Sequence, residues 1–231
     1  MAQFPTTRTT APKPKPADAT LTFGKVLTDH MFLMNYEEGK GWHNPRIEPY
    51  GPLSLDPATS VLHYGQAIFD GLKAFRGDDG QIRLFRPDRH AERFNRSAKL
   101  MSMPEVPVDI IRQSFDALVG LDADWVPRKA GTSLYLRPTI IATDVMLGVH
   151  PVHSLLYFLI LSPVFVIQPR ILENGGSTVS ALIALRYGEA TQFGTSALMA
   201  AGLALFVLTL VINFAAGAVV ARSRSGAGAE A

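Results

Sequence analysis

The chain has 231 residues, of which 47% are hydrophobic and 18% are charged. This balance excludes a wholly disordered chain, because enough apolar side chains are present to form a core. The formal net charge is only +2, which argues against a protein that binds nucleic acid. The sequence has no cysteine, which excludes a disulfide scaffold, a cysteine-ligated metal site and a cysteine nucleophile.

The charged residues are distributed unevenly along the chain. Residues 1–129 carry 33 of them, residues 130–231 carry only nine, and no lysine follows Lys129. We therefore expect two unlike segments. The first 20 residues are rich in Thr, Pro, Ala and Lys and have little to bury, so a disordered arm is predicted there. They also lack the apolar stretch of a signal peptide.

Residues 21–164 are predicted to form a mixed α/β domain, and its first helix is expected over residues 88–101. Asp88 follows a proline and is expected to cap this helix. The apolar face recurs at helical spacing and consists of Phe94, Ala98 and Met101.

A second helix is predicted over residues 108–118. Its apolar stripe has the same spacing and consists of Ile111, Phe115 and Leu118. Strands are predicted over residues 82–85 and 133–136, since both runs are β-prone and each follows a glycine-containing turn.

Residues 146–169 contain no Asp, Glu, Lys or Arg, but they include three prolines. The apolar heart of this stretch, residues 155–161, is short. A buried strand is the favoured interpretation, because a membrane span needs about 20 apolar residues. A broken membrane span is the alternative.

The segment over residues 196–221 has 26 residues without a charge and is followed by Arg222 and Arg224. As a helix it would extend about 39 Å, which exceeds the hydrocarbon core of about 30 Å. A transmembrane helix is therefore predicted, and the alternative is a buried core helix. Small and polar residues recur along it every four positions, a pattern typical of a helix-packing face. They are Thr209, Asn213, Gly217 and Ala221.

Residues 23–164 contain several ordered motifs that closely resemble one enzyme family. The resemblance is to the N-terminal small domain of branched-chain amino-acid aminotransferases, which are fold-type IV pyridoxal-phosphate enzymes. The motifs are FGKVLTDHM from residue 23, LHYGQAIFDGLKAFRG from 62, IRLFRPDRHAERFNRSAKLM from 82, TSLYLRPTI from 132 and LYFLILSPV from 156. This resemblance implies an α+β small domain, a pyridoxal phosphate cofactor, and amino-group transfer between Leu, Ile or Val and 2-oxoglutarate.

The resemblance also implies site residues. Arg93 lies in the HxxRxxxSA stretch that holds the cofactor phosphate in the family, and its planar fork suits a phosphate dianion. The substrate side is expected to combine an apolar box with a contact for carboxylates, the latter from Arg137. The implied substrate-binding residues are Phe23, Tyr64, Phe69, Tyr135, Arg137 and Val149. In the family, Tyr64 and Arg137 lie near the neighbouring subunit, so the resemblance implies a homodimer.

The resemblance ends at Val164, before the larger domain of the family. That domain carries the lysine that forms the Schiff base with the cofactor and moves the proton. No lysine follows Lys129 here, and Lys73 and Lys99 match positions that are not catalytic in the family. No catalytic residue is therefore assigned, and we expect little or no transamination from this polypeptide alone.

Residues 174–221 resemble a different family, the C-terminal end of phosphate ABC-transporter permeases, through a GEA-containing loop before the last helix. The arginines after the helix favour a cytoplasmic C-terminus, which suits a permease with an even number of spans. The resemblance implies a membrane location for this end of the chain, whereas the aminotransferase resemblance implies a cytoplasmic domain.

The leading hypothesis is an aminotransferase-like small domain joined to a transmembrane helix, with amino and 2-oxo acids as ligands and no nucleic-acid partner. The alternatives are a membrane transport component and a non-catalytic module that binds phosphorylated ligands through Arg93. The expected segments are an arm over 1–20, the small domain over 21–164, a linker over 165–192, the helix over 193–222 and a disordered tail over 223–231.

Overall fold

The computed structural model describes residues 4–17, 21, 23–129, 131–165, 180, 183 and 192–225. The chain divides into two units, residues 1–167 and residues 168–231. The predicted linker, the GEA-containing loop and the end of the predicted tail fall outside the described residues, apart from single positions.

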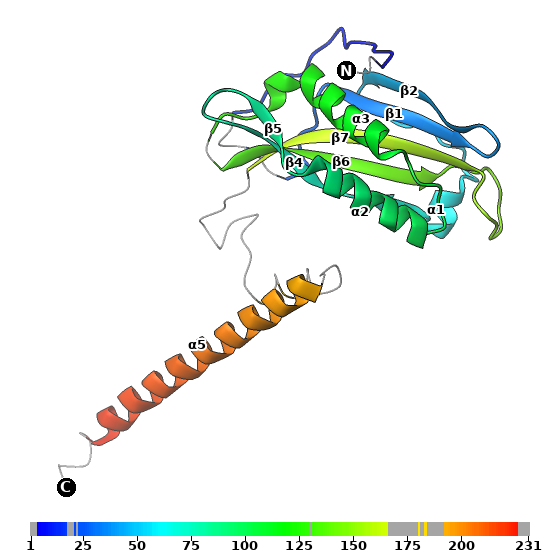
Figure 1. The fold of residues 1–231 in the computed structure, drawn as a ribbon. Coiled ribbons are helices and arrows are strands. Elements are labelled where there is room, and N and C mark those ends of the chain that lie inside the picture. The colour runs from blue at the N-terminus through cyan, green and yellow to red at the C-terminus, as the bar shows by residue number, and fades with distance from the viewer. Residues whose placement is uncertain are drawn as a thin grey trace. The chain divides into compact units, whose positions relative to one another are not determined.

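The first unit is built on a sheet of seven strands, with spatial order β2-β1-β7-β6-β4-β5 and with β3 also pairing with β6. Every pairing between the strands is antiparallel. Figure 1 shows the central strands β1, β7 and β6 side by side. The strands are β1 (His30–Glu37), β2 (Gly41–Pro49), β3 (Ala67–Phe69), β4 (Leu72–Arg76), β5 (Ile82–Leu84), β6 (Thr132–Ala142) and β7 (Ser154–Phe165).

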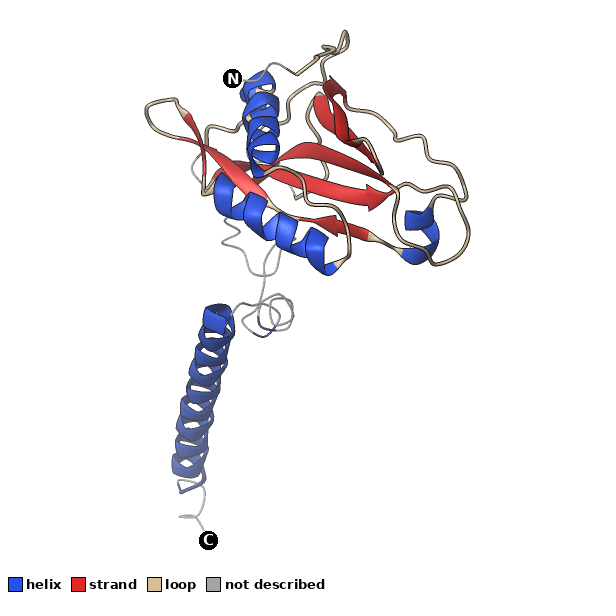
Figure 2. Cartoon of the chain, turned by 45° about the vertical axis from the view of Figure 1, so that its right-hand side comes forward, coloured by secondary structure: helices blue, strands red, loops and turns tan. Residues whose placement is uncertain are grey.

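Two 14-residue helices pack on one face of this sheet (Figure 2). They are α2 (Pro87–Leu100) and α3 (Val108–Leu121), and they bring Phe94 and Phe115 into the main core. A short helix, α1 (Ser60–Tyr64), precedes β3, and a 3₁₀ helix (Ala123–Trp125) follows α3. The predicted α+β architecture is confirmed for this unit.

The predicted helices are confirmed, with corrections at the ends of α2. Asp88 does not cap α2: the cap position is Arg86, with φ of 48°, and Pro87 begins the helix. Proline suits the first helical position, because it has no amide hydrogen to leave unpaired and its φ is already helical. Met101 lies after the last helical turn and is 40% exposed, so it leaves the apolar face that Phe94 and Ala98 share.

The favoured interpretation of residues 155–161 is confirmed. They lie within β7, which pairs with β1 on one side and with β6 on the other. Leu155, Tyr157, Leu159 and Leu161 point into the main core and are at most 1% exposed. A strand enclosed on both edges cannot also be a membrane span, so the alternative of a broken span is wrong.

Residues 4–17 are not the disordered arm that their composition predicts. Main-chain hydrogen bonds join Pro5 and Thr7 to Ile47 in β2, at 2.8 and 2.9 Å. Farther along, the ammonium group of Lys13 donates to two main-chain carbonyls, at 3.2 and 2.7 Å. These contacts depend on the main chain and on distant partners, which composition does not reveal.

The second unit contains α5 (Gln192–Ser225), one continuous helix of 34 residues. The continuous helix predicted over residues 196–221 is therefore confirmed. Within the described residues, Phe193–Val220 is long and apolar enough to cross a membrane by length and composition, and none of its most apolar window is buried. The hydroxyl of Thr209 donates to the Leu205 carbonyl within the same helix, at 2.8 Å.

Candidate functional site

Arg93 is held in place by Asp70. Arg93 lies on α2, and Asp70 lies between β3 and β4, where it is only 6% exposed. The guanidinium donates through Nε to Asp70 Oδ2 at 3.2 Å and through Nη2 to Asp70 Oδ1. His90, one turn earlier on α2, places Nδ1 3.4 Å from the same carboxylate. Arg93 is thus oriented by a two-point contact of the kind that fixes a guanidinium plane.

The environment of Asp70 favours its charged form. Burial would raise the pKa of the Asp70 carboxyl, but hydrogen bonds from His90, Arg93 and the Gly71 amide, together with the charge of Arg93, lower the pKa below its ordinary 3.8. The carboxylate is therefore ionised at neutral pH and neutralises Arg93 locally.

Four of the six predicted substrate-binding residues meet on the sheet face opposite α2 and α3. The Arg137 guanidinium lies 4.4 Å from the ring centroid of Phe69, and its Nε donates to the Tyr135 hydroxyl at 3.1 Å. The rings of Phe23 and Tyr135 meet edge-to-face with centroids 5.0 Å apart. Tyr135 and Arg137 share one face of β6, as their spacing predicts. Phe23 and Phe69 are about 60% exposed, so this cluster forms a surface rather than a core.

The segment Phe69–Gly71 joins this aromatic cluster to Arg93. Phe69 contacts Arg137, and Asp70 contacts Arg93. Gly71 lies against Tyr135, because a Cβ atom on Gly71 would lie 2.6 Å from the Tyr135 Cζ. Three consecutive residues therefore contact the predicted phosphate-binding arginine and two predicted substrate-binding residues.

Tyr64 and Val149 form a separate pair of neighbours. The Tyr64 hydroxyl accepts a hydrogen bond from the main-chain amide of Gly148, at 2.6 Å. Val149, next in the chain, is 92% exposed. No contact recorded among the described residues joins this pair to the cluster around Tyr135. Both lie at the surface, where a second protein chain can reach them.

The described residues fit the phosphate group of pyridoxal phosphate at one point. The side chain of Arg93 is 51% exposed and held in a fixed orientation, so it can also face an anion. The adjacent Asp70 carboxylate opposes a dianion by repulsion. Lys73 on β4 pairs with Tyr135 on β6, so its side chain lies on the face of the aromatic cluster.

Sequence reasoning missed Asp70 and His90 as partners of Arg93. Both lie inside motifs already singled out, IFDGLKAF and RPDRHAERF. His90 and Arg93 are three apart on a helix, so their shared face was predictable. The Asp70 contact spans 23 positions and depends on how β3 and β4 sit against α2.

Curated relatives match a large part of this chain. The chain is 54% identical over 152 residues to branched-chain-amino-acid transaminase 1 of Bacillus subtilis, which covers 66% of this chain and 43% of that protein. It is 44% identical over 176 residues to a branched-chain-amino-acid aminotransferase of Mycolicibacterium smegmatis, which covers 76% of this chain and 47% of that protein.

A solved branched-chain aminotransferase of Escherichia coli superposes with a TM-score of 0.44 at 20% identity, and covers 62% of this chain and 43% of the other. No protein-family model matches the chain. The chain spans less than half the length of the curated relatives above. Over about two thirds of its length, this chain is similar to branched-chain-amino-acid aminotransferases.

Proposed function

We propose that residues 21–164 are the substrate side of a branched-chain aminotransferase, acting on Leu, Ile or Val and 2-oxoglutarate. The observation that carries this proposal is the segment Phe69–Gly71, whose three residues contact Arg137, Arg93 and Tyr135. Supporting it is the identity of 54% to a curated transaminase over 152 residues.

Each predicted residue has a role that its surroundings allow. Arg93, whose side chain is 51% exposed, binds the phosphate of pyridoxal phosphate. Arg137 attracts a substrate carboxylate, while Phe23, Phe69 and Tyr135 contact the aliphatic side chain. Pyridoxal phosphate, when bound, supplies the electron sink for amino-group transfer.

We further propose a homodimer, in which Tyr64 and Val149 of one chain complete the pocket of the other. Both residues are exposed, at 47% and 92%. Among the described residues, no hydrogen bond or ring contact joins either of them to the cluster around Tyr135 in the same chain.

The 231-residue polypeptide is proposed to lack transaminase turnover on its own. The family's catalytic lysine lies in the larger domain, and no lysine follows Lys129 in this sequence. A test uses leucine and 2-oxoglutarate with the purified chain and added cofactor. No turnover is expected. Turnover that survives Lys73→Ala would contradict the proposal, and turnover lost in Lys73→Ala would identify a relocated amine.

Binding of pyridoxal phosphate tests the site separately from turnover. We expect weak, saturable binding that Arg93→Ala weakens about tenfold, the size of one lost charge-assisted contact of about 1.4 kcal/mol. Arg89→Ala is the matched control, since Arg89 also lies on α2 but pairs with Glu92 at 2.8 Å. An equal loss of affinity in both variants would show that Arg93 does not bind the cofactor. Binding of inorganic phosphate with the same affinity would favour a non-catalytic phosphate-binding module.

A second candidate function rests on α5. We propose that α5 crosses a membrane, which favours a membrane component resembling a phosphate permease fragment as the alternative function. The apolar stretch Phe193–Val220 supports this proposal. The full chain is expected in the membrane fraction after alkaline washing. Leu208→Arg with Val211→Arg should release it, because each arginine costs about 3 kcal/mol at the centre of a span. The alanine pair at these positions is the control, and recovery of the wild-type chain in the soluble fraction would refute the span.

A further inference from the structure

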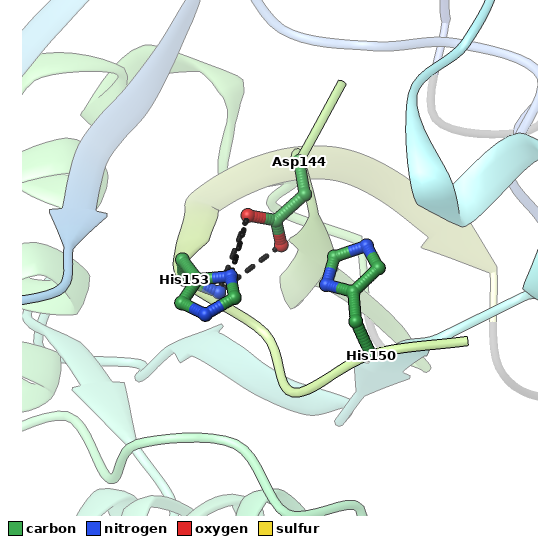
Figure 3. A group of neighbouring side chains, drawn as sticks. All are labelled: Asp144, His150 and His153. Atoms are coloured by element: carbon green, nitrogen blue, oxygen red, sulfur yellow. Dashed lines mark hydrogen bonds and ion pairs between the residues drawn. The ribbon is translucent and has the colours of Figure 1, made fainter. Parts of the chain in front are cut away.

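Two histidines and one aspartate converge in the loop between β6 and β7. They are Asp144, His150 and His153, and each offers one donor atom within 4.8 Å of the others. Figure 3 shows the carboxylate and the two imidazoles turned toward one another. None of the three belongs to the site proposed for the aminotransferase reaction.

Asp144 is fixed before any ligand arrives. Both of its carboxylate oxygens accept the main-chain amide of His153 at 3.2 Å, and one also accepts the amide of Ser154 at 3.1 Å. Its main-chain carbonyl accepts the amide of Ser60 at 2.8 Å. The side chain is 11% exposed, so the carboxylate has a set position and little water around it. A preorganised anion of this kind needs little rearrangement to bind a cation.

Each ring nitrogen of His153 faces a carboxylate of another residue. Its Nδ1 lies 3.6 Å from Asp144 Oδ1, and its Nε2 lies 3.6 Å from Glu38 Oε2 in the β1–β2 turn. A histidine that binds a metal through one nitrogen usually donates the other N–H to a carboxylate. Glu38 supplies that outer carboxylate if Nδ1 is the metal ligand.

His150 is held beside His153 but is poorly satisfied. The two rings stack with centroids 5.6 Å apart and an interplanar angle of 11°. Nδ1 of His150 lies 2.7 Å from the Pro151 carbonyl, and within the described part of the chain its buried Nε2 has no hydrogen-bond partner. Since buried polar atoms are rarely left without a partner, a ligand that engages this ring would remove an unfavourable feature.

We propose that Asp144, His150 and His153 bind one divalent metal ion such as Zn²⁺, Ni²⁺ or Co²⁺. Imidazole with a carboxylate suits Zn²⁺, Ni²⁺ or Co²⁺, whereas Mg²⁺ and Ca²⁺ prefer oxygen ligands alone. Three protein ligands leave a position for water or a further group. The donors need to draw together by a small movement of the loop, because a zinc ion holds its ligands at about 2.0–2.2 Å.

Another histidine of the same unit serves as a matched comparison. His43 also faces a carboxylate, with Nε2 3.4 Å from Glu37 Oε1, but it belongs to no such three-residue group among the described residues. A site that needs two imidazoles predicts that this pair does not bind the ion. His43→Ala is therefore the control for His150→Ala.

The experiment is a calorimetric titration of Zn²⁺ into the full chain, without a histidine tag and in detergent. We expect one ion per chain, with affinity at least tenfold weaker in His150→Ala and Asp144→Asn and unchanged in His43→Ala. Co²⁺ should give a visible absorption band that Zn²⁺ removes and that His150→Ala lacks. The urea midpoint of each variant in EDTA shows that it folds, and His150→Ala decides the result if Asp144→Asn does not. Absence of binding, or equal binding by wild type and His150→Ala, would overturn the proposal.

Discussion

The contact between Gly71 and Tyr135 leads to a sharp prediction for Gly71→Ala. An added Cβ atom would lie 2.6 Å from Tyr135 Cζ and 2.9 Å from Cε2, well inside van der Waals contact. The φ angle of Gly71 is not in the left-handed region, so the space taken by the methyl group is the whole constraint. Tyr135 must therefore move or the strand must shift.

The loss of stability in Gly71→Ala follows from the displacement of the Tyr135 ring and from the contacts that this ring loses. Overpacking costs typically about 1–3 kcal/mol. The displaced ring also loses its edge-to-face contact with Phe23 and its hydrogen bond from Arg137. These contacts lie at a half-exposed surface, so they add little, and we expect a total loss of about 2 kcal/mol.

Urea unfolding followed by tryptophan fluorescence measures this loss. Both tryptophans, Trp42 and Trp125, lie in the first unit, so the signal reports the α/β domain and not α5. With a slope of about 2 kcal/mol per molar urea, Gly71→Ala should lower the midpoint by about 1 M.

The control is Gly120→Ala, an exposed position of α3 where an added Cβ meets nothing within 4 Å. Replacing a helical glycine by alanine should raise stability by about 0.5–1 kcal/mol. In a Tyr135→Ala background, Gly71→Ala should cost much less than it does in the wild type. An unchanged midpoint for Gly71→Ala, or the same cost in both backgrounds, would refute the steric reasoning.

Three further predictions concern buried groups. Folding lowers the pKa of the Asp70 carboxyl, so the folded state binds fewer protons than the unfolded state. The contribution of the ionised carboxyl to the free energy of unfolding should therefore be complete above pH 3.8 and should be lost as the pH falls through the lower folded-state pKa. Asp70→Asn should lower stability at pH 7 by about 1 kcal/mol and flatten this acid dependence in urea titrations, and an unchanged dependence would contradict the assignment. Tyr157→Phe removes a hydroxyl 2.9 Å from the Ser114 hydroxyl and should cost about 1 kcal/mol, measured by the same urea midpoint. Phe115→Ala should cost about 3–5 kcal/mol, since Phe115 is fully buried; a smaller effect than that of Tyr157→Phe would mean that the core relaxes around it.

The helices and the central strand were predictable because their signals are local. Ile111, Phe115 and Leu118 repeat at helical spacing, and all three are fully buried. The apolar run in β7 is typical of a strand with both faces covered, and alternate side chains of β7 enter the main core on one face and a second apolar cluster on the other.

Other features depend on contacts between distant residues. The order of residues 4–17 rests on partners in β2 and in the segment before β1, which their polar composition does not suggest. Asp88 looked like a helix cap because its side chain suits one, but the preceding proline takes the first helical position.

The sequence supplied the residues proposed for the candidate site, but it did not supply their arrangement. The motifs identified Arg93, Tyr135 and Arg137, and spacing placed the last two on one face of a strand. The pairing of Arg93 with Asp70 needed the positions of β3, β4 and α2, which no local pattern supplies.

The main-chain pairing of Pro5 and Thr7 with Ile47 has a consequence for solubility. β2 is an outer strand of the sheet, and its free main-chain groups are a template for pairing with strands of other molecules. The segment beside Ile47 occupies part of that edge and begins with a proline, which cannot donate an amide hydrogen to an incoming strand. Removing residues 1–9 should therefore promote edge-to-edge association of folded molecules, and it also takes the ring of Phe4 away from Phe32 in the main core.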